Sequence, residues 1–334
     1  TIVMETQVRR IQRTGKSTYT VSLPKKWVEK VGLKRFDEVY IVPFENGLLL
    51  FAGSPEALTE AEVVVEQPAE PEMAVRLFFS KYLDGYGKIR VIFPSASLQI
   101  AGYLKDCIRR WLVGVEIIEE SSSELVAQCM PMHDKLPVKM SIERMGSIAS
   151  NMIRDAVDSF LRADEELAAE VLKRDDEVDR FYHFVVRQMN IAVRDPRILK
   201  ALNLSSPSDC ITYALGAKNV ERAADHAENI CRRVSMLRRV PRRSEELAKV
   251  SEEVVNVFRS SVNSLLHPDI VFADKTLKKA DIVAERLENL QTQSGYESAT
   301  FQTVLNSLKR IAEYAADLSE ASINLSGRVV TVSS

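Results

Sequence analysis

Residues 141 to about 325 contain no strand signal, and their apolar side chains recur with the 3.6-residue period of amphipathic helices. Proline or Ser-Gly interruptions divide this region into six long helical segments. The interruptions fall at residues 195–196, 205–207, 240–241, 267–268 and 294–295. The segments form two similar sets of three, in which residues 220–227 align with residues 308–315. This long repeat predicts tandem three-helix bundles over residues 141–236 and 243–326.

At 334 residues the chain exceeds what one hydrophobic core supports, so we expect further domains ahead of the bundles. Residues 54–72 are rich in Glu, Pro and Ala, which predicts a linker flanking one short strand at 63–65. Residues 73–140 predict a small α/β module. Its expected helices are 74–83 and 98–113, and its expected strands are 89–93, 115–118 and 125–129. Because no catalytic spacing occurs in it, we interpret it as a spacer or dimerisation module, with a ligand-sensing module as the alternative.

Charge is distributed unevenly along the chain. The formal net charge is only −2, which excludes a polycation that binds nucleic acid or membranes along its whole length. Residues 1–52 nevertheless hold nine basic and five acidic side chains, whereas residues 53–140 hold nine and thirteen. Any affinity for a polyanion is therefore expected at the N-terminal end.

Four cysteines lie far apart without the pairing of a zinc ribbon or a disulfide framework. They are Cys107, Cys129, Cys210 and Cys231. A reducing, cytoplasmic location is the simplest interpretation. No run of about eighteen apolar residues occurs, so we expect no membrane insertion.

The N-terminal segment, residues 1–53, predicts a small β-rich domain. Its expected strands are 8–11, 19–23, 39–43 and 48–51, and residues 24–31 are expected to form a short helix opened by Pro24. Two hairpins of this size bury too little surface to be stable alone. We therefore expect a second copy to complete the core, giving a homodimer or a higher homo-oligomer.

Several short motifs in this segment follow one another in a characteristic order. They are Val8-Arg9-Arg10-Ile11, Thr14-Gly15-Lys16, Leu23-Pro24-Lys25, Val31-Gly32-Leu33 and Asp37-Glu38-Val39. In this order the segment resembles the AbrB/SpoVT/MazE family of swapped-hairpin transcription factors. One departure is Phe36, which stands immediately before Asp37 where the family usually has glycine. This departure affects the expected geometry of the turn at that position. The resemblance implies a dimeric half-barrel fold that binds DNA.

Basic side chains gather on the first strand, the following turn and the start of the short helix. These candidate DNA-binding residues are Arg9, Arg10, Arg13, Lys16, Lys25 and Lys26. Both side-chain types neutralise phosphates, and arginine can also read guanine edges. Two-fold symmetry would double the charge without new sequence. The alternative interpretation is a dimerisation barrel whose basic rim is only solvated.

Two pairs of carboxylates with four-residue spacing stand in the first bundle. Asp175 and Asp179 lie in its second helix, and Glu221 and Asp225 lie in its third. Residues four apart share a helix face, so each pair can direct two oxygens at one cation. A helical wheel places the acids about 100° from the apolar stripe, which predicts exposed positions at the rim of the bundle. The alternative is a pair of solvated helix faces with ordinary surface charges.

Residues 141–325 resemble the PhoU family of phosphate-uptake regulators, in which two three-helix bundles carry acidic motifs that bind metal clusters. The stretches 174–179 and 220–230 carry this resemblance in the first bundle. It implies divalent or iron-type metal ions at Asp175, Asp179, Glu221 and Asp225. The aligned positions of the second bundle are Ala280, Ala284, Lys309 and Glu313, so its site is expected to be lost.

Six arginines surround Pro241 at the joint between the bundles. They are Arg232, Arg233, Arg238, Arg239, Arg242 and Arg243. Arginine at a helix C-terminus complements the helix dipole. An equally weighted alternative is a contact for an acidic partner, nucleic acid or phosphate.

Together these patterns predict a multidomain α+β protein: a swapped-hairpin half-barrel, a small α/β module and PhoU-like tandem helical bundles. The leading hypothesis is a cytoplasmic, non-enzymatic regulator of phosphate homeostasis, in which a dimeric basic barrel binds DNA and the bundles sense or relay phosphate status. The rival hypothesis is an accessory protein that does not bind DNA and docks on a phosphate ABC transporter component or a signalling kinase. Enzymatic activity is not expected, since no nucleophile–base constellation occurs.

Overall fold

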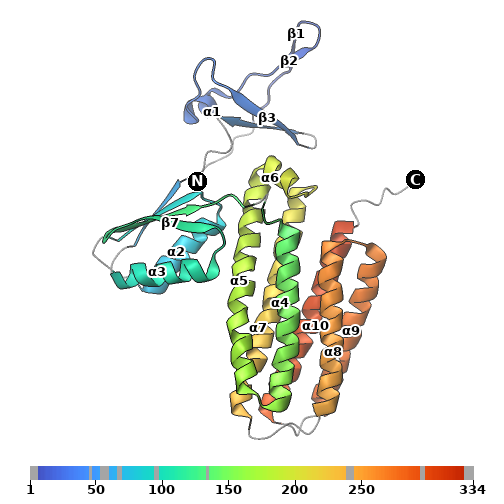
Figure 1. Cartoon of the computed structure of the whole chain (residues 1–334). Helices are drawn as coiled ribbons and strands as arrows, with labels where there is room; N and C mark the ends of the chain where they lie inside the picture. Colours follow the sequence, from blue (N-terminus) through green and yellow to red (C-terminus); the bar gives the residue numbers. More distant parts are fainter. Residues whose placement is uncertain are drawn as a thin grey trace, which may run out of the picture. The chain divides into compact units, whose positions relative to one another are not determined.

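The computed structural model describes residues 7–44, 47–52, 60–65, 70–93, 98–132, 135–237, 244–293 and 298–326. They fall into two compact units, Thr1–Leu58 and Thr59–Ser334. The first unit consists of short hairpins and one helix, and the second contains an α/β module and a group of long helices (Figure 1). The predicted fold class, a multidomain α+β protein with a C-terminal helical region, is confirmed.

The first unit contains two antiparallel hairpins and one short helix. Its elements are β1 (Gln12–Thr14), β2 (Thr18–Thr20), α1 (Lys25–Lys30), β3 (Val39–Phe44) and β4 (Gly47–Ala52). The prediction of a first strand at residues 8–11 was wrong. Pairing begins beside the turn at Gly15, with Thr14 opposite Thr18, and it extends only as far as Gln12. Residues 8–11 therefore precede the hairpin.

Besides Gly15 in the β1–β2 turn, two residues that follow α1 adopt left-handed backbone conformations. Gly32 follows α1 with a φ of 74°, and Phe36 has the same φ of 74°. The backbone N–H of Lys34 donates to Asp37 Oδ2 at 2.7 Å and so closes the second turn. The left-handed turn thus forms without glycine, at a backbone cost of about 1–2 kcal/mol.

None of the described side chains in the first unit is buried. Val8, Ile11 and Tyr19 are 89%, 71% and 69% exposed. Large apolar side chains left in water contribute nothing to folding, and a cluster of them is typical of a surface that another chain covers. A single copy of this unit lacks a hydrophobic core.

The α/β module opens the second unit. Its elements are β5 (Glu60–Val64), α2 (Pro71–Leu83), β6 (Lys88–Ile92), α3 (Leu98–Trp111), β7 (Val115–Glu120) and β8 (Glu124–Cys129). The sheet order is β5-β6-β8-β7, with β5 parallel to β6 and the other pairs antiparallel. The short strand expected at residues 63–65 is part of β5, and it forms one edge of this sheet. The core lies where α2 and α3 cover one face, with Phe78, Ile89 and Leu104 fully buried.

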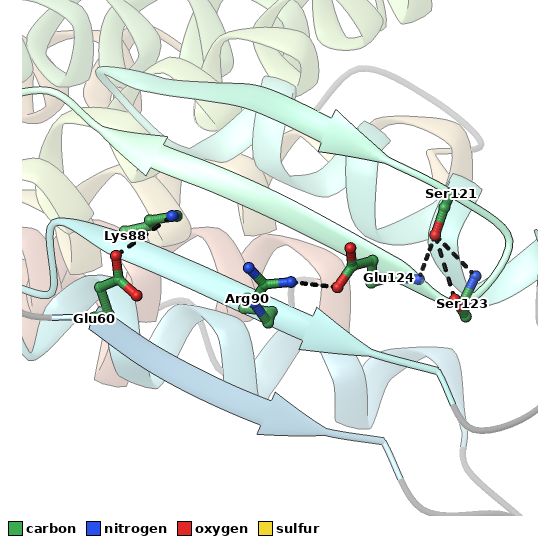
Figure 2. Close-up of polar contacts among 6 residues, drawn as sticks. All are labelled: Glu60, Lys88, Arg90, Ser121, Ser123 and Glu124. Atoms are coloured by element: carbon green, nitrogen blue, oxygen red, sulfur yellow. Dashed lines mark hydrogen bonds and ion pairs between the residues drawn. The ribbon is translucent and has the colours of Figure 1, made fainter.

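The other face of the sheet carries polar side chains (Figure 2). Lys88 on β6 pairs with Glu60 on β5 at 3.3 Å, and Arg90 pairs with Glu124 on β8. A turn at residues 121–123 joins β7 to β8, and Ser121 Oγ accepts the backbone N–H of Glu124 at 3.1 Å. These cross-strand pairs suit a face in contact with water, where each contributes modestly.

Seven helices follow the module. They are α4 (Val138–Arg162), α5 (Glu165–Arg194), α6 (Pro196–Ala201), α7 (Pro207–Cys231), α8 (Ser244–Leu266), α9 (Ile270–Gln293) and α10 (Ala299–Ser326). Six are the predicted long helices, and α6 is a short addition. Helices α4, α5 and α7 pack together, as do α8, α9 and α10, and the two sets meet along α7–α10 and α4–α8 (Figure 1). Among the described helices, none is long and apolar enough to cross a membrane.

Local capping explains where these helices begin. Asp164 accepts the backbone N–H of Leu167 at 2.9 Å and so starts α5. Asp195 accepts the N–H of Arg197 at 2.9 Å, which, with Pro196 at the first helical position, creates α6. Ser206 and Asp209 form a reciprocal capping box at α7.

The α/β module is attached to α5 at the C-terminal end of α2, where helix carbonyls lack partners within their own helix. Side chains at positions 187, 190 and 194 lie on one face of α5 and supply the missing donors. Arg187 donates to the carbonyl of Tyr82 and to the carbonyl of Tyr86, the latter at 2.9 Å. Asn190 donates to the carbonyl of Leu83 at 2.9 Å, and Arg194 donates to the carbonyl of Asp84. Arg187 is only 5% exposed. A buried guanidinium fixes the module against the first bundle, because its two hydrogen bonds cross from α5 to the carbonyls of Tyr82 and Tyr86.

Two glycines allow α8 to approach the first bundle closely. A Cβ added to Gly146 on α4 would lie 2.6 Å from Cγ1 of Val262, and one on Gly216 of α7 would lie 2.5 Å from Cδ2 of Leu265. Leucine can rotate away, whereas the branched side chain of valine is stiff at χ1. The α4–α8 contact therefore depends on glycine at position 146.

We expect Gly146→Ala to lower the free energy of unfolding by about 1–3 kcal/mol through overpacking against Val262. Gly102→Ala in α3 is the matched control, since a Cβ at this position meets nothing within 4 Å. This substitution should stabilise the helix by about 0.5–1 kcal/mol. Urea denaturation followed by circular dichroism measures both. Equal midpoints for the two variants would contradict the close contact.

Candidate functional site

Helices α5 and α7 bring together the four acids that the sequence predicts as metal ligands. Asp175 and Asp179 lie on α5, Glu221 and Asp225 lie on α7, and the two helices pack along each other. The charges of Glu221 and Asp225 act on both acids of α5. We call these four residues the acidic cluster.

The expectation that all four acids are exposed at the rim was wrong. Glu221 is only 8% exposed, and Asp175 and Asp179 are half-buried, while Asp225 lies at the exposed edge of the cluster. The wheel measured angles from a single apolar stripe on each helix. Both helices pack on more than one side, however, because α5 also contacts α2 and α3, and α7 also contacts α10.

Two oxygens of the cluster are buried without a hydrogen-bond partner. They are Oδ1 of Asp175 and Oε2 of Glu221. The other oxygen of Glu221, Oε1, accepts from Nζ of Lys218 at 2.5 Å. Buried polar atoms are nearly always satisfied in proteins, so two orphaned carboxylate oxygens on facing helices indicate a site that a ligand completes.

Burial and mutual repulsion both disfavour ionisation of the cluster. Burial, followed by the charges of Asp179 and Glu228, raises the pKa of Asp175 to about 8. Burial, followed by the charge of Glu221, raises the pKa of Asp179 to about 7. At the edge, partial desolvation and then the charge of Glu221 raise the pKa of Asp225 to about 6. Such crowding costs stability and is typical of functional sites.

Sequence reasoning missed one acid that acts on this cluster. Glu228 stands three residues after Asp225 on α7, and its charge raises the pKa values of both Asp175 and Asp225. Arg232 donates to Glu228 at 2.6 Å. The same helical spacing that identified the other pairs could have identified Glu228, because positions three and four apart share a face.

The donor set fits a hard cation. It offers carboxylate oxygens only, two of them orphaned and buried, which is the chemistry of Mg²⁺, Ca²⁺ or Mn²⁺ sites and is compatible with iron. In the ranges that the structure describes, no three His, Cys, Asp or Glu side chains are already gathered as ligands of one ion. Side-chain rotation within the cluster would be needed to close a coordination shell.

The second bundle differs at the aligned positions. Lys309 pairs with Glu288 at 2.8 Å, and Arg310 pairs with Glu313. The ammonium group of Lys309 lowers the pKa of Glu288 through a hydrogen bond. These carboxylates have basic partners and lack the crowding seen in the first bundle.

The predicted DNA-binding side chains lie on the exposed surface of the first unit. Arg9 and Arg10 precede β1, and Arg13 lies within it, donating to the carbonyl of Lys16 at 2.5 Å. Lys25 begins α1 and is 87% exposed, 3.6 Å from Glu29. Exposed basic groups on a hairpin and at the start of a helix can reach phosphates.

Part of the arginine group between the bundles lies outside the described residues, namely Arg238, Arg239, Arg242 and Arg243. Of the other two, Arg232 pairs with Glu228. Arg233 has a buried Nε without a partner, and its Nη1 lies 3.7 Å from the sulfur of Met236.

The chain combines a helical bundle, which has an acidic cluster between two of its helices, with a small basic hairpin unit. Residues 142–234 match the PhoU domain family, and residues 12–57 match the family described as "Antidote-toxin recognition MazE, bacterial antitoxin". The chain thus carries a PhoU domain and a MazE/AbrB-like domain.

Curated relatives match the PhoU region. The phosphate-specific transport system accessory protein PhoU homolog of Caulobacter vibrioides is 36% identical over 91 residues, covering 27% of this chain and 36% of the relative. The homolog of Pseudomonas aeruginosa is 35% identical over 120 residues, covering 35% of this chain and 46% of the relative. A crystal structure of PhoU from Streptococcus pneumoniae aligns with a TM-score of 0.48 and 18% identity, over 58% of this chain and 96% of that one. The sequence matches span less than half of each relative's length.

We expect Asp175→Asn to raise the free energy of unfolding of the chelator-treated protein at neutral pH by about 1 kcal/mol, because it removes a carboxylate that burial and its neighbours disfavour. Glu177→Gln is the control on the same helix, since Glu177 is 56% exposed. Urea denaturation in the presence of EDTA measures both. A loss of stability in Asp175→Asn would show that the charge is structural.

Proposed function

We propose that this chain is a PhoU-type regulator of phosphate uptake that binds DNA through its N-terminal unit and a metal ion through its acidic cluster. The observation that supports it is the presence, in one chain, of a PhoU domain and a MazE/AbrB-like domain with exposed basic side chains. The relatives are described as accessory proteins of phosphate transport, which supports a regulatory rather than an enzymatic role. The four cysteines of the chain are free and buried, which suits a reducing cytoplasm.

DNA binding is supported by charge and by the incomplete core of the first unit. An identical chain covering Val8, Ile11 and Tyr19 would supply the missing interior and would place two sets of basic side chains on one assembly. Backbone phosphates would then meet Arg9, Arg10 and Arg13 from both copies. Contacts of this kind provide affinity that depends steeply on salt.

Metal binding is supported by the orphaned oxygens of Asp175 and Glu221. A cation bound there would supply positive charge and could recruit an anion such as phosphate. The protein's part is to hold four carboxylates together and to exclude water from Glu221. Binding would also offset the repulsion that raises the pKa values of Asp175 and Asp179. The bundles would thereby acquire two states, with and without the cation, which a regulator requires.

Replacing Arg9, Arg10 and Arg13 together by glutamate should weaken binding to mixed-sequence duplex DNA by more than about 100-fold and flatten its salt dependence, because each lost phosphate contact removes about 0.9 from the slope. Fluorescence anisotropy at several salt concentrations measures this. The control reverses three exposed charges outside the predicted set, Lys30, Lys34 and Arg35. Wild-type protein that does not bind the duplex would favour an accessory protein that docks on a phosphate transporter component or a signalling kinase.

Replacing both Asp175 and Glu221 by alanine should abolish the metal content of the purified chain, as measured by elemental analysis for magnesium, calcium, manganese and iron. The matched control replaces Asp281 and Glu285, which are exposed and also four apart, on α9 of the second bundle. That control should retain wild-type metal content. Equal metal in all three proteins would contradict the site.

A further inference from the structure

Helix α5 faces two neighbours through adjacent acids. Asp175 belongs to the acidic cluster with α7, whereas Asp176, the next residue, is held by the α/β module. Nε1 of Trp111 donates to Asp176 Oδ1 at 2.8 Å, and Nε of Arg110 donates to Asp176 Oδ2 at 2.6 Å. Both oxygens of one carboxylate are thus bound by the last turn of α3. The module touches the helix that carries the cluster one residue away from a predicted ligand.

Aromatic packing holds this contact in place. The ring of Trp111 meets that of Phe79 on α2 edge-to-face at 6.3 Å, and Phe79 meets His183 of α5 in the same way at 5.3 Å. The guanidinium of Arg110 lies 5.2 Å from the centroid of the Trp111 ring. Since Arg187 fixes the C-terminal end of α2 to the same helix, a change at Asp176 would be transmitted to a firmly docked module.

The charge of Arg110 also reaches the cluster itself. The hydrogen bond to Asp176 is the main stabiliser of the Arg110 cation, and the negative charges of Asp176 and Asp179 add to it. Arg110 therefore serves as a partial counter-ion at one edge of the cluster. A cation bound by Asp175 and Asp179 would be a second positive charge beside Arg110, which the adjacent carboxylate of Asp176 holds, and like charges repel.

We propose that the α/β module reads cation occupancy of the acidic cluster, through charge repulsion between the bound cation and Arg110, which the adjacent Asp176 holds. The contacts of Arg110 and Trp111 with Asp176 are the ones that change. This inference rests on the proposed cation site and gives the module the ligand-sensing role that its sequence leaves open. Because linkage is reciprocal, removing Arg110 must change the cation affinity by the same factor with which the cation weakens the Arg110 contact.

The first test is the affinity of the full chain for Mg²⁺ by isothermal titration calorimetry. Arg110→Gln should bind Mg²⁺ about fivefold or more tightly than wild type. Arg109→Gln is the matched control, because Arg109 is exposed on the same helical turn and its replacement removes the same charge. Equal affinities for the two variants would overturn the inference while leaving the cation site standing. Absence of Mg²⁺ binding to the wild-type chain would overturn both.

The second test observes the module directly. The chain contains two tryptophans, so Trp27→Phe leaves Trp111 as the sole emitter. Addition of diamagnetic Mg²⁺ should shift its emission maximum, with a midpoint equal to the calorimetric one, because the indole N–H changes partner. The same titration of the Asp175→Ala/Glu221→Ala chain in the Trp27→Phe background should show no shift. Mg²⁺ binding with constant Trp111 emission would refute the reading role.

Discussion

The structure of the second unit depends on the packing of one helix, α5, against α2, α3, α4 and α7. Its Arg187, Asn190 and Arg194 supply donors to the end of α2, its Asp176 holds the end of α3, and Asp175 and Asp179 face α7. A thirty-residue helix presents enough faces for all these contacts. The module and the first bundle are joined by several directional hydrogen bonds, which tolerate little displacement.

The acidic cluster is locally unfavourable, and this is informative. A chain selected only for stability would replace Asp175 or Glu221, since each has a buried carboxylate oxygen without a partner and the pKa of Asp175 is raised. In the second bundle, the aligned Glu313 pairs with Arg310, and Lys309, which stands at another aligned position, pairs with Glu288. The unpartnered carboxylates are crowded together in the first bundle, whereas the carboxylates at the corresponding part of the second bundle have basic partners. This difference supports a ligand at the first bundle, because unfavourable local arrangements of side chains concentrate at functional sites.

Much of this architecture could be predicted without coordinates. Helix period and proline breaks predicted six helices in two sets, whereas the boundary between α4 and α5 at Ala163 lies at none of the predicted breaks. The α/β module followed from alternation between helix and strand patterns. The predictions were least accurate at β1, where a three-residue pairing depends on one turn, and at α6, which Asp195 and Pro196 create within a break. Short elements depend on single contacts rather than on a sustained period.

By itself the amino-acid sequence determined which residues share a helix face, and hence that Asp175 pairs with Asp179 and Glu221 with Asp225. It also determined where basic charge accumulates. Only the tertiary structure decided that Glu221 is buried, that the charge of Glu228 acts on Asp175 and that Asp176 accepts a hydrogen bond from Trp111. The physical reason is that helical periodicity gives an angle around one axis, whereas the neighbour that covers each angle is set by packing between residues far apart in the chain.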